Sequence, residues 1–152
     1  MKLQFILNGV SVEADIEADT LLLDLLREKG CCSVKRGCET ANCGLCTVWL
    51  DEKPILSCST LAARVENRRV TTMESLQEEA EEFGRFLAGE GAEQCGFCSP
   101  GFIMNVLARE KELKDPTEED IKEYLAGNLC RCTGYMGQLR AVHKYLHRKD
   151  GR

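Results

Sequence analysis

Apolar and polar residues alternate at the start of the chain and again over residues 46–58. In the first stretch the alternation runs through Leu3, Phe5, Leu7, Val10, Val12, Ala14 and Ile16. It is interrupted at Asn8–Gly9, a pair that favours a tight turn, so we expect a β-hairpin. In the second stretch Val48 and Leu50 share a face, and residues 51–54 suit a turn. A second hairpin is expected there, and a short strand within residues 68–76.

A helical period separates the two predicted hairpins. Leu22, Leu25 and Leu26 form an apolar stripe within residues 19–30. Asp19 or Thr20 could cap this helix, and Gly30 could end it. Strands, one helix and hairpins in this order predict a small α+β domain.

The second half of the chain has helical periodicity throughout. We expect helices over residues 74–91, 99–113, 115–128 and 137–149. Ser99 and Pro100 suit the cap and first position of the second helix, and Asp115–Pro116 suits the start of the third. On the last helix Leu139, Val142 and Leu146 share one face. The pattern predicts a β-rich domain over residues 1–75 and a four-helix bundle over residues 76–152.

Composition and charge narrow the possible functions. The 20 basic residues are outnumbered by 25 acidic ones, which disfavours nucleic-acid binding. No apolar run reaches the roughly 20 residues of a membrane span, and residues 1–15 have no signal-peptide pattern. We therefore expect a cytoplasmic protein. Thiols stay reduced in the cytoplasm, so the ten cysteines indicate metal binding or catalysis rather than disulfides.

The first half of the chain contains four cysteines with the spacing C-x4-C-x2-C followed by a distant fourth. They are Cys38, Cys43, Cys46 and Cys58. This is the plant-type ferredoxin spacing for a [2Fe–2S] cluster, whose two irons need thiolates from several directions. Gly37 and Gly44 would let the backbone approach the cluster. The alternatives are a zinc site, which prefers paired short knuckles, or unligated thiols. A thioredoxin motif is disfavoured because β-forming residues follow Cys46.

The second half contains two close cysteine pairs separated by 31 residues. They are Cys95 with Cys98, and Cys130 with Cys132. Both pairs lie at expected helix ends, so a bundle could bring them together, and a helix N-terminus could face an anionic cluster there. Spacing alone allows zinc or an iron–sulfur cluster. A neighbouring redox cluster favours a second cluster, because two would form a relay.

The cysteine motifs together resemble one protein family. The segments "GCETANCGLCTVWLD", "QCGFCSPG" and "GNLCRCTGY" resemble the small iron–sulfur subunit of the molybdenum hydroxylases, the group that includes xanthine dehydrogenase, aldehyde oxidoreductase and carbon monoxide dehydrogenase. The resemblance covers nearly the whole chain. Two departures are the loop residues 39–42, where glycine is more common, and Met136–Gly137, where proline is frequent.

The resemblance implies a fold, cofactors and partners. It implies a β-grasp ferredoxin-like domain and a four-helix domain, each with one [2Fe–2S] cluster. The ligands of the cluster nearer the flavin would be Cys38, Cys43, Cys46 and Cys58. Those of the cluster nearer the molybdopterin would be Cys95, Cys98, Cys130 and Cys132. Gln94 and Cys132 would also approach the pterin, which belongs to a large partner subunit, and FAD would belong to a third subunit.

The function that follows is electron transfer without substrate chemistry on this chain. Electrons would pass from the molybdopterin site through two clusters to FAD or another acceptor, as part of an oxidoreductase complex. The rival interpretations are a free-standing ferredoxin-like carrier and a zinc-stabilised interaction module. Outside the ligand sets, Cys31 and Cys32 are expected to be buried packing residues, and His143 and His147 to lie at a surface or interface.

Overall fold

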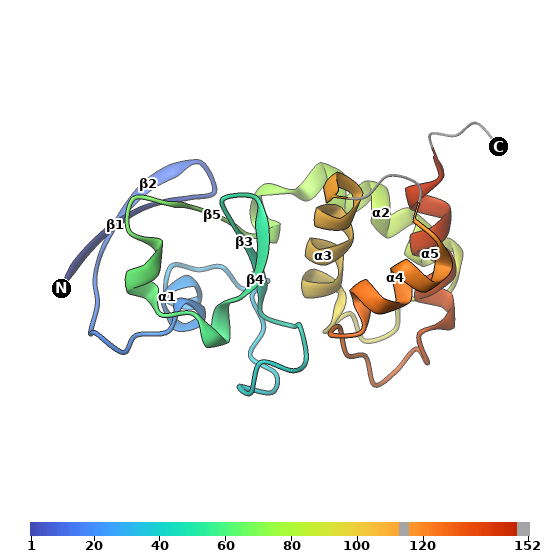
Figure 1. Cartoon of the computed structure of the whole chain (residues 1–152), viewed down its shortest axis with the longest axis horizontal. Helices are drawn as coiled ribbons and strands as arrows, with labels where there is room; N and C mark the ends of the chain where they lie inside the picture. Colours follow the sequence, from blue (N-terminus) through green and yellow to red (C-terminus); the bar gives the residue numbers. More distant parts are fainter. Residues whose placement is uncertain (113–115, 149–152) are drawn as a thin grey trace.

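The chain folds into a mixed α/β structure, described by a computed structural model for residues 1–112 and 116–148. The strands are β1 (Lys2–Leu7), β2 (Val10–Asp15), β3 (Thr47–Leu50), β4 (Lys53–Leu56) and β5 (Arg69–Thr71). The α-helices are α1 (Leu22–Glu28), α2 (Gln77–Gly89), α3 (Ser99–Glu112), α4 (Glu118–Leu125) and α5 (Met136–Leu146). The strands and α1 form one half of the molecule, and the other four helices form the second (Figure 1).

The five strands form one sheet in the order β2-β1-β5-β3-β4. Both predicted hairpins are confirmed, and each turns through two residues with positive φ. These are Asn8 (51°) with Gly9 (83°), and Asp51 (49°) with Glu52 (68°). Such turns match the natural twist of paired strands. The short strand β5 joins the hairpins, because it pairs parallel to β1 and antiparallel to β3.

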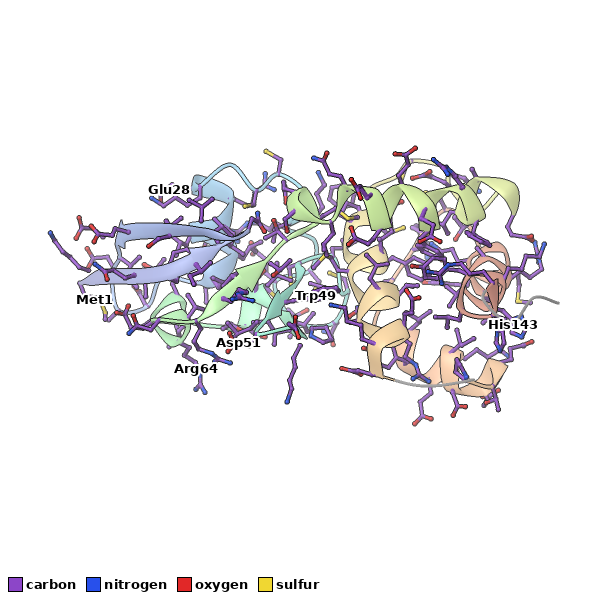
Figure 2. The ribbon with its side chains drawn as sticks, turned by 90° about the horizontal axis from the view of Figure 1, so that it is seen from above. Met1, Glu28, Trp49, Asp51, Arg64 and His143 are labelled. Carbon is purple, nitrogen blue, oxygen red and sulfur yellow. The ribbon has the colours of Figure 1, made fainter. Side chains whose placement is uncertain are left out.

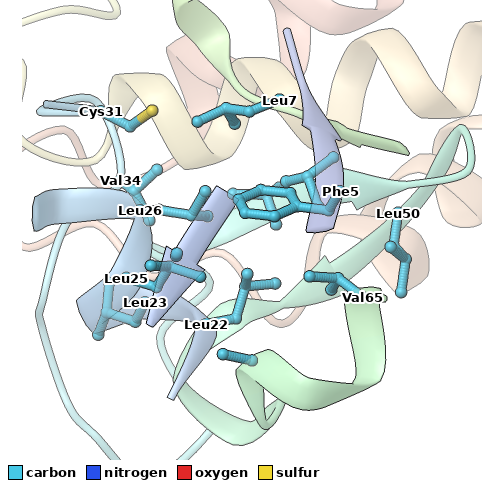
Figure 3. Close-up of a cluster of buried hydrophobic side chains, with 14 of the residues drawn as sticks. Phe5, Leu7, Leu22, Leu23, Leu25, Leu26, Cys31, Val34, Leu50 and Val65 are labelled. Atoms are coloured by element: carbon cyan, nitrogen blue, oxygen red, sulfur yellow. The ribbon is translucent and has the colours of Figure 1, made fainter. Parts of the chain in front are cut away.

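The first hydrophobic core lies between the sheet and α1. Leu3, Phe5 and Leu7 are at most 8 % exposed, as expected for every second residue of a strand with one buried face. Four leucines of α1 meet them from the helix side, as Figure 3 shows for this cluster; they are Leu22, Leu23, Leu25 and Leu26. Burial of these aliphatic side chains is the main stabilising contribution in this half.

The second hydrophobic core lies among α2, α3, α4 and α5. Phe83 and Tyr145 are two of its aromatic members, with ring centroids 5.0 Å apart in an edge-on arrangement. Trp49 belongs to this core although it lies on β3, and its ring Nε1–H donates to the carbonyl of Met104 in α3 at 2.9 Å. Figure 2 shows Trp49 between the sheet and the helices. The two halves are therefore joined by a buried side chain as well as by the connecting chain.

Two predicted helix caps differ from the structure, and a third lies outside the described residues. Thr20 does not cap α1, because its hydroxyl accepts the Glu17 N–H instead. Ser99 lies within α3 rather than before it, and its hydroxyl donates to Glu93. Asp115 lies outside the described residues, and α4 is capped by Thr117. In the first two cases the side-chain hydroxyl forms a hydrogen bond with a residue outside the helix.

Within the two described ranges, no helix has both the length and the apolar character that crossing a membrane requires.

Candidate metal centres

The first cysteine loop directs backbone N–H groups at one thiol. Sγ of Cys38 accepts from the N–H groups of Thr40 (3.5 Å), Asn42 (3.3 Å) and Cys43 (3.3 Å). The backbone N–H and then the side chain of Thr40, followed by the Asn42 N–H and the Cys43 side chain, lower the pKa of Cys38 to about 6. Such a ring of amides stabilises anionic sulfur.

The loop reaches this conformation without the glycines that its relatives are expected to have. Glu39 (φ 55°) and Ala41 (φ 59°) adopt the left-handed conformation that glycine enters at less cost. Two non-glycine residues of this loop therefore adopt a conformation for which glycine is the usual choice. Gly37 supports the expectation of close approach, since a Cβ there would lie 2.9 Å from Sγ of Cys43.

The fourth cysteine of the first set is brought back to the loop by a short helical turn. Cys58 lies in the 3₁₀ helix Ser57–Ser59, where the backbone N–H and hydroxyl of Ser57 both donate to the Cys46 carbonyl, at 3.3 and 2.8 Å. Burial raises the pKa of Cys58, and the adjacent Cys46 thiol raises it further. The distant cysteine and the loop are therefore neighbours, as the spacing predicted.

The second set of cysteines surrounds a cavity at the end of α3. Cys95, Cys98, Cys130 and Cys132 all line a cavity of about 360 Å³, and so does Cys43 of the first set. Sγ of Cys132 lies 3.5 Å from Sγ of Cys95. Burial raises the pKa of Cys98 to about 11, with a further contribution from the adjacent Cys130 thiol. The helices bring the two sequence pairs together at one site.

Three polar side chains around this cavity form hydrogen bonds with the second set of cysteines that the sequence analysis did not predict. The Thr133 hydroxyl donates to Sγ of Cys130 at 3.1 Å, and Gln138 Nε2 donates to Sγ of Cys98 at 3.7 Å. The hydroxyl of Tyr135 accepts the Cys130 N–H at 3.0 Å. Donors of this kind orient thiolate ligands and stabilise their charge.

The helical period could have revealed Gln138. The buried face of α5 is formed by Gln138, Ala141, Val142 and Tyr145, whereas Leu139 and Leu146 are only partly buried. The predicted face was therefore wrong by one residue at its start. A glutamine in phase with a buried face is a polar group that needs a partner, and here its side chain contacts a cysteine.

The arrangement of thiols suits two irons better than one ion. The thiols lie in neighbouring pairs, which is how a cluster with two bridged irons is held. Paired thiolates repel each other, and bound iron would compensate their charge. The residues present thus fit [2Fe–2S] clusters.

The remaining candidate residues occupy different environments. Gln94 and Cys132 are both exposed, on loops beside the second site. Cys31 is buried as expected, and burial is the main cause of its raised pKa. The same expectation is wrong for Cys32, which is exposed in a surface turn that follows α1. The ring of His143 stacks on that of His147 at an exposed position of α5.

Apolar side chains gather at the surface around the second site. Phe97 and Leu129 are each 48 % exposed, Tyr135 is 45 % and Met136 is 58 % exposed. The last three also line a neighbouring cavity of about 390 Å³. Exposed apolar groups that are contiguous in this way mark interaction surfaces more often than scattered ones do.

Comparison with known protein families agrees with two cluster-binding segments. Residues 5–71 match the family described as 2Fe-2S iron-sulfur cluster binding domain, and residues 72–143 match the [2Fe-2S] binding domain family. The first half is therefore ferredoxin-like, and the chain's cofactors are two [2Fe–2S] clusters.

Relatives of known function share most of the chain. The nicotinate dehydrogenase small FeS subunit of Eubacterium barkeri is 39 % identical over 91 % of this chain and 90 % of its own length. The xanthine dehydrogenase iron-sulfur-binding subunit of Escherichia coli O157:H7 is 43 % identical over 85 % of this chain and 84 % of its own length.

Solved structures of similar sequence superimpose on nearly the whole of this chain. Quinoline 2-oxidoreductase from Pseudomonas putida 86 superimposes with a TM-score of 0.89 and 32 % identity, covering 100 % of this chain and 96 % of that one. Aldehyde oxidoreductase from Desulfovibrio gigas gives a TM-score of 0.88 and 34 % identity, covering 99 % of this chain but 17 % of that one. This chain belongs to the family of small iron–sulfur subunits of the molybdenum hydroxylases, the electron-transfer subunits of these oxidoreductases.

Proposed function

We propose that this chain relays electrons from a molybdopterin site on a large partner subunit, through its two [2Fe–2S] clusters, towards FAD or another acceptor. One observation carries the proposal: Cys43 of the first cysteine set lines the cavity formed by the second set. An electron relay needs its two metal centres close together. Two structural metal sites that act separately have no need to lie close to each other. The clusters supply one-electron chemistry, while the chain's residues bind them, fix their spacing and shield them.

The ligand assignment follows the neighbouring thiols. The first cluster would be held by Cys38, Cys43, Cys46 and Cys58, and the second by Cys95, Cys98, Cys130 and Cys132. At the second site, the short contact supports Cys95 and Cys132 as ligands of one iron. The other iron would take Cys98 and Cys130, which influence each other's pKa. Thr133 and Gln138 would stabilise the charge on this second pair.

The finer description of the fold belongs to the same proposal. The sheet with α1 is proposed as a β-grasp domain over residues 1–75, and α2 to α5 as a four-helix bundle domain over residues 76–152. The division is supported by two hydrophobic cores, one on each side of residue 75, with Trp49 as the exception. The cytoplasm is the proposed location, since reduced thiols are needed to bind iron.

The molybdopterin-bearing partner would contact the chain at the second site. The exposed positions of Gln94 and Cys132 support their proposed contact with the pterin. The apolar side chains around them, including Phe97 and Met136, support a large subunit that covers this surface. A FAD-binding subunit would take the electrons that leave the first cluster.

Purification of the native protein tests this function. We expect about four irons and about four sulfides per chain, together with a molybdopterin-bearing chain that co-purifies. A colourless protein with zinc in place of iron would contradict the relay. A holo-protein that runs alone in the native extract would favour a free-standing carrier instead.

Serine variants test the ligand sets with a matched control. Cys58→Ser should disturb the first cluster, and Cys132→Ser the second. Cys32→Ser replaces an exposed cysteine outside both sets, so iron content should not change. Equal iron in all three variants, with unchanged spectra, would refute the assignment.

A further inference from the structure

A backbone hydrogen bond links the loops that contain the two cysteine sets. The N–H of Leu129 donates to the carbonyl of Cys43 at 2.9 Å. Cys43 is a proposed ligand of the first cluster, and Leu129 immediately precedes Cys130, a proposed ligand of the second. Few covalent bonds therefore separate either ligand sulfur from this hydrogen bond.

The packing around this hydrogen bond is close enough to require glycine on both sides. A Cβ on Gly44 would lie 2.6 Å from the Gly127 carbonyl oxygen and 2.6 Å from the side-chain Nδ2 of Asn128. A Cβ on Gly101 would lie 3.0 Å from Cα of Leu45. The backbones of the two loops and of α3 are thus in close contact, with the Asn128 side chain packed against Gly44, and this packing fixes their separation.

Asn128 secures the loop from the other side. Its side chain is 7 % exposed, and its Oδ1 accepts a hydrogen bond from Asn105 Nδ2 at 2.9 Å. Asn105 also donates to the Thr47 hydroxyl at 3.4 Å, and Thr47 donates to the Gly44 carbonyl at 2.7 Å. The network runs from one cysteine loop through α3 to the other, so it constrains both ends of the Cys43–Leu129 hydrogen bond.

We propose that the Cys43–Leu129 hydrogen bond is the electron bridge between the two clusters, and that Asn128, held by Asn105, is the positioning residue that keeps it formed. The inference rests on the proposed relay function. In the step one electron leaves the second cluster, which is oxidised, and reaches the first, which is reduced. No covalent bond forms or breaks and no proton moves. The chain's contribution is a short, rigid path.

The test compares three variants of the full chain carrying both clusters. Asn128→Ala and Asn105→Ala remove the two ends of the side-chain hydrogen bond. Asn8→Ala is the control, because Asn8 also makes two hydrogen bonds across the fold, to Thr72, but contacts neither cysteine loop through them. All three variants should lose some stability, so stability alone does not discriminate between them.

Three measurements separate a positioning role from a structural one. Hydrogen exchange of the Leu129 amide should become faster in Asn128→Ala and Asn105→Ala but not in Asn8→Ala. In the dithionite-reduced protein, the magnetic interaction between the clusters should weaken in the first two variants and persist in the control. Electron equilibration between the clusters, after rapid one-electron reduction, should slow in the same two variants.

The outcomes distinguish this proposal from the relay itself. Wild-type protein without two clusters would refute the relay. Wild-type protein with both clusters, and variants that match Asn8→Ala in exchange, magnetic interaction and electron transfer, would overturn the bridge alone. Loss of the second cluster from both Asn128→Ala and Asn105→Ala would also overturn it, since the network would then serve cluster assembly.

Discussion

Replacement of Trp49 by alanine should destabilise both halves of the molecule at once. Trp49 is 3 % exposed and lies on β3, yet its ring belongs to the core formed by the helices. Its Nε1–H donates to Met104 of α3, and the Lys111 ammonium lies 4.5 Å from the ring centroid. Truncation would open a cavity between the sheet and α3 and remove both polar contacts.

The magnitude follows from the burial of the ring. A buried aromatic side chain removes roughly 150–250 Å² from water, which is about 4–6 kcal/mol at 25 cal/mol per Å². The alanine side chain would itself be buried and would keep part of this stabilisation. The expected loss in the free energy of unfolding is therefore about 3–5 kcal/mol. For a chain of this size, that corresponds to a fall in Tm of about 6–20 °C. Trp49→Phe keeps most of the apolar contact and loses the hydrogen bond, at a cost of about 1 kcal/mol.

Thermal unfolding of the anaerobic holo-protein, followed by far-UV circular dichroism and by visible absorbance, measures the effect. Val10→Ala is the control, because Val10 is a strand residue that is 64 % exposed and should change stability by less than about 0.5 kcal/mol. Cluster absorbance from both halves should be lost at a lower temperature in Trp49→Ala. A Tm shift no larger than that of Val10→Ala would refute the view that Trp49 joins the two halves.

Three further predictions concern single side chains. Ser33 donates its N–H and hydroxyl to Glu74, and although burial raises the pKa of that carboxyl, the hydrogen bonds outweigh it and hold the pKa below its usual 4.5. The folded state therefore binds fewer protons than the unfolded state. This stabilisation is present above pH 4.5 and is lost as the pH falls through the pKa of Glu74 in the folded state. In the Glu74→Gln variant, the urea midpoint should depend less on pH over this acidic range. Gly101→Ala should cost about 1–3 kcal/mol through overpacking, whereas Gly84→Ala, with open space around it, should gain about 0.5–1 kcal/mol, both measured by urea unfolding. Thr117→Ala removes the cap of α4 and should cost about 0.5–2 kcal/mol by the same assay.

For each of these three predictions, the opposite result would contradict the physical reason given. A Glu74→Gln variant with the wild-type pH dependence would place the acid sensitivity on another carboxyl. Equal stability changes in Gly101→Ala and Gly84→Ala would mean that α3 and the first cysteine loop can separate without cost. An unchanged Thr117→Ala would mean that packing alone holds the start of α4.

Local sequence signals predicted the elements but not their connections. Asn8–Gly9 located the first hairpin because a two-residue turn depends on its own residues. The pairing of β5 between β1 and β3 could not be read in this way, since it joins segments far apart in the chain. The cap positions of Thr20 and Ser99 were wrong for the same reason, because competing partners outside the helix are invisible to a local pattern.

The candidate sites, too, were predictable where they depend on local sequence and not where they depend on long-range packing. The spacing of the cysteines located them and favoured their grouping into two sets, because ligand spacing is a local property of the chain. It did not place Cys43 beside the second set, nor did it find the network of Thr47, Asn105 and Asn128. These contacts depend on how the helices dock on the sheet, which no single segment encodes.

The late position of β5 in the chain has a consequence for biosynthesis. Residues 38–58 supply every cysteine of the first set, but the sheet beneath them is completed only by Arg69–Thr71, which pair with both hairpins. Non-local pairing of this kind cannot form until the last strand has left the ribosome. The second set is completed later still, at Cys132. The order of synthesis thus makes the first site ready for iron before the second, and a chain interrupted between residues 72 and 129 would retain one complete set of cysteines.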